Sequence, residues 1–226
     1  MNSYPAAIIW DLDGTLIDSA PDLADALSTL LREHGYPGLE EDQVRNMIGN
    51  GVEKLIERGF ATAGVIVTQQ QLQYLVPRFL LIYAACATNK TRMYEGARSV
   101  LQYFTEAGVR QGLCTNKPED ISKQILADLS VARHFDVVIG GDTTAEKKPD
   151  PLPLQACLDA LDAVPRASMM IGDSGTDIAT ARAINMPVGI VSFGYARNAV
   201  TTLGADFLIN KLSSLPAALG ELRKTG

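Results

Sequence analysis

The stretch Trp10-Asp11-Leu12-Asp13-Gly14-Thr15-Leu16 begins where an apolar run, Ala6-Ala7-Ile8-Ile9, ends. Residues two apart in an extended chain point to the same side, so the carboxylates of Asp11 and Asp13 would face one site just beyond a strand. Open α/β sheets bind their ligands at this carboxyl end of the strands. The stretch therefore predicts a functional site, and with it an α/β fold.

The turn after these carboxylates has residues suited to it. Gly14 lets the backbone turn sharply, and the Thr15 hydroxyl can hold a neighbouring carboxylate or cap the segment that follows. A strand that runs into an Asx-type turn would give the same Asp-x-Asp-Gly pattern. The rest of the chain has to decide between the two interpretations.

Length and composition narrow the class of protein. The chain has 226 residues, of which 46% are hydrophobic, and it suits one large domain or a domain with an insertion. No apolar stretch approaches the ~18 residues that cross a bilayer, and the N-terminus lacks a signal-peptide pattern, so we expect a cytoplasmic protein with no membrane partner. With 20 basic and 26 acidic residues the net charge is -6, which argues against a nucleic-acid-binding surface.

Hydrophobic periodicity divides the chain into two kinds of segment. Residues 18–94 carry helical spacings without a convincing strand, whereas short apolar runs alternate with helical stretches from Gly96 onward. We therefore expect a Rossmann-like three-layer α/β core with a central parallel sheet, formed by residues 1–17 and 95–226. Residues 18–94 are expected to form an inserted all-helical domain.

Two later apolar runs are followed by residues that can hold a phosphate. Thr115 and Asn116 follow the run 112–114 and supply a hydroxyl, an amide and backbone donors. Lys148 precedes Pro149, and a residue before proline is held extended, so its ammonium would be fixed in place. For Thr115 and Asn116 the alternative is an ordinary turn, and for Lys148 it is a solvated basic turn.

A third apolar run, 169–171, leads into Gly172 and an acidic turn. Asp173 and Asp177 are four residues apart and would lie near one face of a helix that begins there. Asp11, Asp13 and Asp173 would repel one another at one sheet edge unless a cation joined them. Carboxylate ligands without clustered His or Cys indicate Mg²⁺.

These elements together resemble the motifs of the haloacid dehalogenase superfamily of phosphotransferases. The order and spacing match in Asp-Leu-Asp-Gly-Thr-Leu-Ile-Asp-Ser (11–19), Thr-Asn-Lys-Pro (115–118), Lys-Lys-Pro-Asp-Pro (147–151) and Gly-Asp-Ser-x-x-Asp (172–177). A narrower resemblance, to phosphoglycolate phosphatases, rests on Asp-Ser-Ala-Pro (18–21), Ile-Gly-Asn-Gly (48–51), Val-Ile-Gly-Gly-Asp (138–142) and Phe-Gly-Tyr (193–195).

The resemblance implies a role for each motif residue. Asp11 would be the nucleophile that forms an aspartyl-phosphate, and Asp13 the general acid and base. Thr115, Asn116 and Lys148 would bind the transferring phosphoryl group.

The resemblance also implies a magnesium site. Mg²⁺ would take the side chains of Asp11 and Asp173 and the backbone carbonyl of Asp13. Asp177 would steady the site without touching the metal, as would Thr15 if its hydroxyl holds a carboxylate.

The inserted helices match the position of the family's mobile cap. Asn50 and Lys54 are our candidates for residues that read the substrate, with a solvent-facing helix residue as the alternative for Lys54. The implied reaction is Mg²⁺-dependent hydrolysis of a small phosphorylated metabolite of carbohydrate metabolism, 2-phosphoglycolate giving glycolate and phosphate.

Several alternatives to this reaction stay open. One is a phosphatase for a sugar phosphate, a nucleotide or pyrophosphate. Another is a phosphomutase, and a third is a non-enzymatic regulatory protein that binds a phosphometabolite. The sequence leaves both a monomer and a homodimer open.

Overall fold

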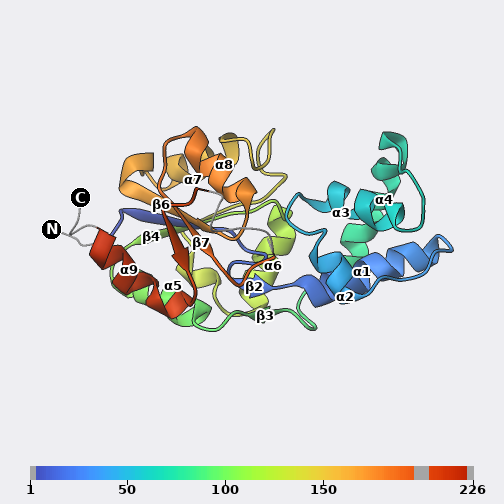
Figure 1. The fold of residues 1–226 in the computed structure, drawn as a ribbon, viewed down its shortest axis with the longest axis horizontal. Coiled ribbons are helices and arrows are strands. Elements are labelled where there is room, and N and C mark those ends of the chain that lie inside the picture. Colours follow the sequence, from blue (N-terminus) through green and yellow to red (C-terminus); the bar gives the residue numbers. More distant parts are fainter. Residues whose placement is uncertain (1–3, 196–203, 223–226) are drawn as a thin grey trace. The chain divides into compact units, whose positions relative to one another are not determined.

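The structure, a computed structural model, describes residues 4–195 and 204–222. The chain divides into two compact units, one of residues 1–17 and 93–226 and one of residues 18–92 (Figure 1). Within the described ranges no helix has the length and apolar character needed to span a membrane.

A six-stranded parallel sheet forms the centre of the first unit, in the order β5-β4-β1-β6-β7-β8. Its strands are β1 (Ala7–Trp10), β4 (Arg110–Cys114), β5 (Val137–Ile139), β6 (Ser168–Gly172), β7 (Val188–Val191) and β8 (Phe207–Ile209). Strands buried on both faces read as continuous apolar runs, and all four residues of β1 are fully buried. The expected parallel α/β core is confirmed.

Helices cover both faces of this sheet, with α7 and α8 on one side and α5 and α9 on the other (Figure 1). The helices of the unit are α5 (Ala97–Glu106), α6 (Glu119–Asp128), α7 (Leu152–Ala160), α8 (Gly175–Ala183) and α9 (Leu215–Leu222), and its 3₁₀ turns are η1 (Ala132–His134), η2 (Pro165–Ala167) and η4 (Leu212–Ser214). This arrangement is the three-layer architecture predicted from the alternating apolar and helical segments.

The register of the sheet fixes where the site lies. Trp10 of β1 pairs with Leu113 of β4 on one side and with Ile171 of β6 on the other. Because these strands are parallel and adjacent, the residues after each of them meet at one edge of the sheet.

The second unit is helical. Its helices are α1 (Ala20–Glu33), α2 (Glu41–Arg45), α3 (Val52–Ala61) and α4 (Gln69–Ala84). Leu27 and Leu30 of α1 are fully buried, as is Phe79 of α4, which matches the helical spacing of apolar residues. The chain enters and leaves this unit through β2 (Ile17–Asp18) and β3 (Arg92–Met93), which pair as a short two-stranded sheet. The function of this unit as a cap stays a prediction.

Candidate active site

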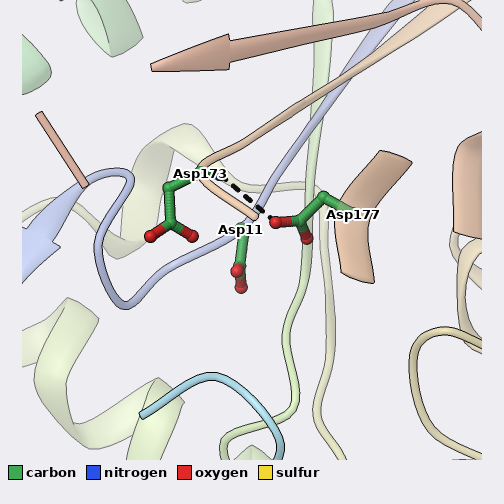
Figure 2. Close-up of side chains that lie close together, drawn as sticks. All are labelled: Asp11, Asp173 and Asp177. Atoms are coloured by element: carbon green, nitrogen blue, oxygen red, sulfur yellow. Dashed lines mark hydrogen bonds between the residues drawn. The ribbon is translucent and has the colours of Figure 1, made fainter. Parts of the chain in front are cut away.

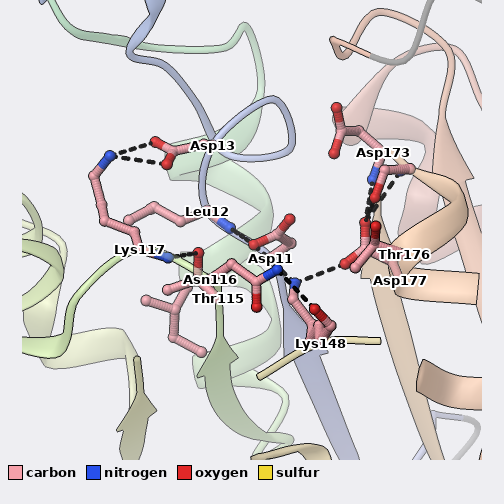
Figure 3. Close-up of polar contacts among 12 residues, drawn as sticks. Asp11, Leu12, Asp13, Thr115, Asn116, Lys117, Lys148, Asp173, Thr176 and Asp177 are labelled. Atoms are coloured by element: carbon pink, nitrogen blue, oxygen red, sulfur yellow. Dashed lines mark hydrogen bonds and ion pairs between the residues drawn. The ribbon is translucent and has the colours of Figure 1, made fainter. Parts of the chain in front are cut away.

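Asp11 is the first residue after β1, and its carboxylate lies at the centre of the polar cluster (Figure 3). Its Oδ1 accepts a hydrogen bond of 2.8 Å from the backbone N–H of Leu12 and lies 3.0 Å from Nζ of Lys148. Burial raises the pKa of Asp11 to about 6, although the charge of Lys148 opposes this shift. To act as an anion near neutral pH, the Asp11 carboxylate therefore needs positive charge close to it.

Lys148 is buried between two carboxylates. Its Nζ lies 2.7 Å from Oδ1 of Asp177 as well as 3.0 Å from Asp11. Burial disfavours the ammonium, but the charges of Asp11 and Asp177 outweigh this effect and raise the pKa of Lys148 above its usual value. Lys148 is therefore a permanent cation at this edge of the sheet.

The carboxylate of Asp177 is fully engaged within the fold. While Oδ1 accepts from Lys148, Oδ2 accepts from the backbone N–H of Asp173 at 3.2 Å and from the N–H and hydroxyl of Ser174 at 3.1 and 2.7 Å. These bonds tie the first turn of α8 to the end of β6. Asp177 thus contacts both Lys148 and the Asp173 backbone, and its role as a supporting residue stays a prediction.

Asp173 follows β6 and is 4% exposed. Its Oδ2 accepts a hydrogen bond of 2.7 Å from the backbone N–H of Tyr195. Burial, together with the charges of Asp177 and Asp11, raises the pKa of Asp173 well above its usual value. Two neighbouring carboxylates with raised pKa values mark a place where a cation would be stabilised.

Oxygen ligands of Asp11, Asp173 and Asp177 lie within 4.8 Å of one another (Figure 2). Carboxylates are ligands that Mg²⁺ prefers, and a charge of +2 would relieve the repulsion among buried anions. Because both oxygens of Asp177 already accept hydrogen bonds, Asp11 and Asp173 are the better-placed ligands. The residues at this edge fit a magnesium ion.

The raised pKa values predict how Mg²⁺ stabilises the protein. Between the usual pKa of 3.8 and about 6, folded Asp11 binds more protons than unfolded Asp11, so without metal the free energy of unfolding falls as pH rises through this window. Protons and Mg²⁺ would compete for the same carboxylates. At a hundredfold excess over Kd we expect Mg²⁺ to raise Tm by about 5–10 °C at pH 7.5 and by much less at pH 5.

Thermal unfolding with and without Mg²⁺ at the two pH values measures this effect. Asp173→Asn removes one candidate ligand and is expected to abolish the shift. Asp120→Asn, on the exposed face of α6, is the matched control and should keep it. An equal shift in Asp173→Asn and the unmodified protein would show that Mg²⁺ binds elsewhere.

Gly14 and Gly194 pack directly against the Asp173 side chain. A Cβ on Gly14 would lie 2.3 Å from Oδ2 of Asp173, and one on Gly194 would lie 2.3 Å from its Cβ. Gly14 also has φ +82°, a conformation that side chains rarely adopt. The turn after Asp13 therefore has to be glycine so that the Asp173 carboxylate can lie against it.

For the reaction that the resemblance implies, hydrolysis of 2-phosphoglycolate, Gly14→Ala is expected to lower kcat/KM by about 100-fold. A displacement of about 1 Å at a group that has to be precisely placed costs that much, and the Mg²⁺-dependent Tm shift should weaken as well. Gly108→Ala is the matched control, since Gly108 has φ +71° and open space around its Cα. It should reproduce the backbone strain of about 1–2 kcal/mol and retain the activity. Equal activity losses in both variants would mean that strain alone is responsible.

The residues after β4 lie on the other side of Asp11. Thr115 and Asn116 are buried. The Thr115 hydroxyl accepts a hydrogen bond of 3.3 Å from the backbone N–H of Lys117, and a hydroxyl that accepts can also donate to a phosphate oxygen. The Asn116 amide donates to the backbone carbonyl of Lys148 at 2.9 Å, so it positions the lysine.

The Asp13 carboxylate has a partner that the sequence analysis gave no role. Nζ of Lys117 lies 3.0 and 2.8 Å from the two oxygens of Asp13. The one available signal was spacing, because Lys117 is two residues after Thr115 and shares its side in an extended chain.

The surroundings of the Thr15 hydroxyl differ from those that the sequence suggested. The residue is fully buried, and its hydroxyl has no hydrogen-bond partner among the residues that the structure describes. Its backbone N–H donates to the Leu12 carbonyl at 3.2 Å. The contact between this hydroxyl and a carboxylate, which the sequence suggested, is therefore not observed.

The two substrate-reading candidates, Asn50 and Lys54, belong to the helical unit. Oδ1 of Asn50 accepts a hydrogen bond of 2.7 Å from Arg58, which also donates to the Met47 carbonyl at 2.7 Å. Lys54 is more than half exposed and pairs with Glu57 at 2.6 Å. Asn50 is thus held in a fixed orientation, whereas Lys54 has the setting of a solvent-facing helix residue.

Comparison with known proteins shows which family this chain resembles. Residues 8–191 match the model of the haloacid dehalogenase-like hydrolases. The chain is 41% identical over 220 residues to a phosphoglycolate phosphatase of Rhodospirillum rubrum, covering 96% of this chain and 91% of the relative. It is 39% identical over 213 residues to one of Caulobacter vibrioides, covering 94% and 90%.

Solved structures show the same similarity. A predicted phosphoglycolate phosphatase from Haemophilus somnus superposes with a TM-score of 0.88 at 26% identity, over 96% of this chain and 99% of that one. The chain belongs to the haloacid dehalogenase-like hydrolase family. Within it, the chain is an enzyme of the phosphoric monoester hydrolase class, and the family resemblance seen in the sequence is confirmed.

Proposed function

We propose that this enzyme hydrolyses 2-phosphoglycolate to glycolate and phosphate, with Mg²⁺ and through an aspartyl-phosphate on Asp11. The observation that carries the proposal is the position of the Asp11 carboxylate, which is buried at the sheet edge 3.0 Å from the cation of Lys148, with Asp13 two residues further on. The names of the relatives support the choice of substrate.

In the first step, a carboxylate oxygen of Asp11 attacks phosphorus and the bond to the leaving oxygen breaks. Asp13, in its protonated form, gives its proton to the leaving oxygen, so that glycolate departs with a hydroxyl group. The two carboxyl groups have different partners in the fold, since Asp11 lies by Lys148 and Asp13 by Lys117.

In the second step, water attacks the phosphorus of the aspartyl-phosphate. Asp13, now a carboxylate, takes a proton from this water, and the bond between phosphorus and the Asp11 oxygen breaks. Phosphate leaves, and both side chains return to their starting forms. The net reaction consumes one water for each ester.

Fixed charges stabilise the transferring phosphoryl group. Lys148 offsets negative charge that develops on phosphorus-bound oxygens, and Thr115 donates its hydroxyl to one of them. Asn116 positions Lys148 through the hydrogen bond from its side-chain amide to the Lys148 carbonyl, and its backbone N–H is a further donor for the phosphoryl group. The side chains of Asp11 and Asp173 and the backbone carbonyl of Asp13 would hold Mg²⁺, which would supply further positive charge to the phosphoryl oxygens.

The helical unit is proposed to act as the cap, with residues 18–94 as its span and Asn50 and Lys54 as residues that read the substrate. Because Arg58 takes the Asn50 carbonyl oxygen, the amide of Asn50 is left to donate. Such a donor suits an anionic substrate. We further propose a cytoplasmic location and a small metabolite, not a nucleic acid, as the partner, in a monomer or homodimer.

Phosphate release from 2-phosphoglycolate, sugar phosphates, nucleotides and pyrophosphate, each with and without Mg²⁺, tests the proposal. We expect Mg²⁺-dependent release with the highest kcat/KM for 2-phosphoglycolate. A higher value for another monoester would retain the mechanism and replace the substrate. Isomerisation of a sugar phosphate without net release would instead identify a phosphomutase.

A further inference from the structure

Lys117 is a buried cation of the site that the mechanism above leaves without a task. Its side chain is 3% exposed and that of Asp13 is 13% exposed, and both Asp13 oxygens accept from its Nζ. In Figure 3 the Asp13 carboxylate points toward Lys117 and away from Asp11 and Lys148. The structure therefore holds Asp13 turned away from the carboxylate with which it has to cooperate.

The backbone fixes Lys117 from both sides. Its N–H donates to the Thr115 hydroxyl at 3.3 Å, and its carbonyl accepts from the N–H of Gly141 at 2.9 Å. A Cβ on Gly141 would lie 2.4 Å from the carbonyl oxygen of Asn116, so the two segments are closely packed. Lys117 is therefore held in place both by the segment that presents Thr115 and by the segment of Gly141.

The proximity of Asp13 and Lys117 matches the shape of one class of substrate. In 2-phosphoglycolate a single carbon separates the leaving oxygen from the carboxylate carbon, so the leaving oxygen and the carboxylate oxygens lie roughly 2.6–3.6 Å apart. A site that serves both groups needs its acid and its cation side by side. Asp13 and Lys117 are side by side, at 2.8 Å.

We propose that Lys117 is a positioning residue for Asp13 that also reads a second anionic group on the substrate. The inference rests on the proposed function, because it requires Asp13 to serve the leaving oxygen. A substrate carboxylate replaces the Asp13 carboxylate at the ammonium of Lys117. Asp13, no longer paired with this ammonium, takes up a proton from solvent and turns toward the leaving oxygen. A neutral monoester gives Lys117 no new partner, so Asp13 stays where it is. The preferred substrates are therefore phosphate monoesters with an anion one carbon from the ester oxygen.

The test compares 2-phosphoglycolate with 2-hydroxyethyl phosphate, in which a neutral CH₂OH replaces the carboxylate. We expect the unmodified enzyme to favour 2-phosphoglycolate in kcat/KM, and Lys117→Met to lower this preference by about 10- to 100-fold, the range for losing a hydrogen bond to a charged group. Lys117→Arg should recover part of it. Lys123→Met, which removes a half-exposed lysine of α6 in the same unit, is the control and should leave the preference unchanged.

Two results in this assay would overturn the inference. One is an equal loss for both substrates in Lys117→Met, which is the behaviour of a merely structural residue. The other is an unmodified enzyme that hydrolyses the two substrates equally well, which would leave the phosphatase assignment intact and remove the role of Lys117.

A binding experiment covers the case in which Lys117→Met does not fold or the enzyme hydrolyses neither substrate. Asp13→Asn with Lys117→Met removes both charges of the pair together. Calorimetry is expected to show that Asp13→Asn binds 2-phosphoglycolate more tightly than 2-hydroxyethyl phosphate, and that the double variant has lost most of this difference. An undiminished difference in the double variant would contradict the inference, whatever the outcome for turnover.

Discussion

Asp11→Asn lowers kcat for 2-phosphoglycolate by at least about 10⁴-fold, the scale on which enzymes lose rate when a nucleophile is removed. The amide has nearly the shape of the carboxylate but cannot attack phosphorus as an anion. The substitution also removes one buried negative charge from a cluster in which burial raises the pKa of Asp11 to about 6. We therefore expect Asp11→Asn to be at least as stable as the unmodified protein without Mg²⁺, so that the loss of rate is not a loss of fold.

Phosphate release and thermal unfolding, measured on the same preparations, check both parts of this prediction. Asp120→Asn makes the same chemical change at an exposed site on α6 and should leave kcat unchanged. An Asp11→Asn variant within tenfold of the unmodified kcat would remove Asp11 from the mechanism.

Lys148→Met is expected to lose both activity and stability. The substitution leaves Asp11 and Asp177 buried without the cation that lies 3.0 and 2.7 Å from them, and breaking a buried pair in this way costs about 3–5 kcal/mol. The loss of free energy of unfolding should be larger at pH 7.5 than at pH 5, because below about pH 6 Asp11 takes up a proton and no longer needs a cation.

Urea unfolding of Lys148→Met at the two pH values, without Mg²⁺, measures this difference. Lys123→Met breaks an exposed pair with Glu119 and serves as the control, with no change expected in the free energy of unfolding. If Lys148→Met and Lys123→Met were equally stable, the charge balance described for the site would be incorrect.

Much of the core could be predicted from the sequence because its signals are local. The continuous apolar run before Asp11 is typical of a strand buried on both faces, and polar residues after such runs mark the functional edge of a parallel sheet. Asp11, Lys148, Asp173 and Asp177 are indeed brought together. Strand order was not predicted, because pairing depends on contacts between distant segments.

Contacts between side chains were the part that the sequence could not supply. Lys117 and Asp13 are 104 positions apart, and no local pattern links them. The same applies to the Asn116 amide, which binds the Lys148 carbonyl, and to the Thr15 hydroxyl, which lacks the expected carboxylate. In the helical unit, Asn50 was a candidate from the sequence, but the bond from Arg58 that orients it is visible only in the structure.

The stereochemical course at phosphorus tests most directly whether hydrolysis passes through Asp11. A phosphorothioate monoester of glycolate made chiral with ¹⁷O would be hydrolysed in H₂¹⁸O, and the configuration of the released thiophosphate determined by NMR. Each in-line displacement inverts phosphorus, so two successive displacements, first by Asp11 and then by water, predict overall retention. Overall inversion would mean that water attacks the substrate directly, and would contradict an aspartyl-phosphate intermediate.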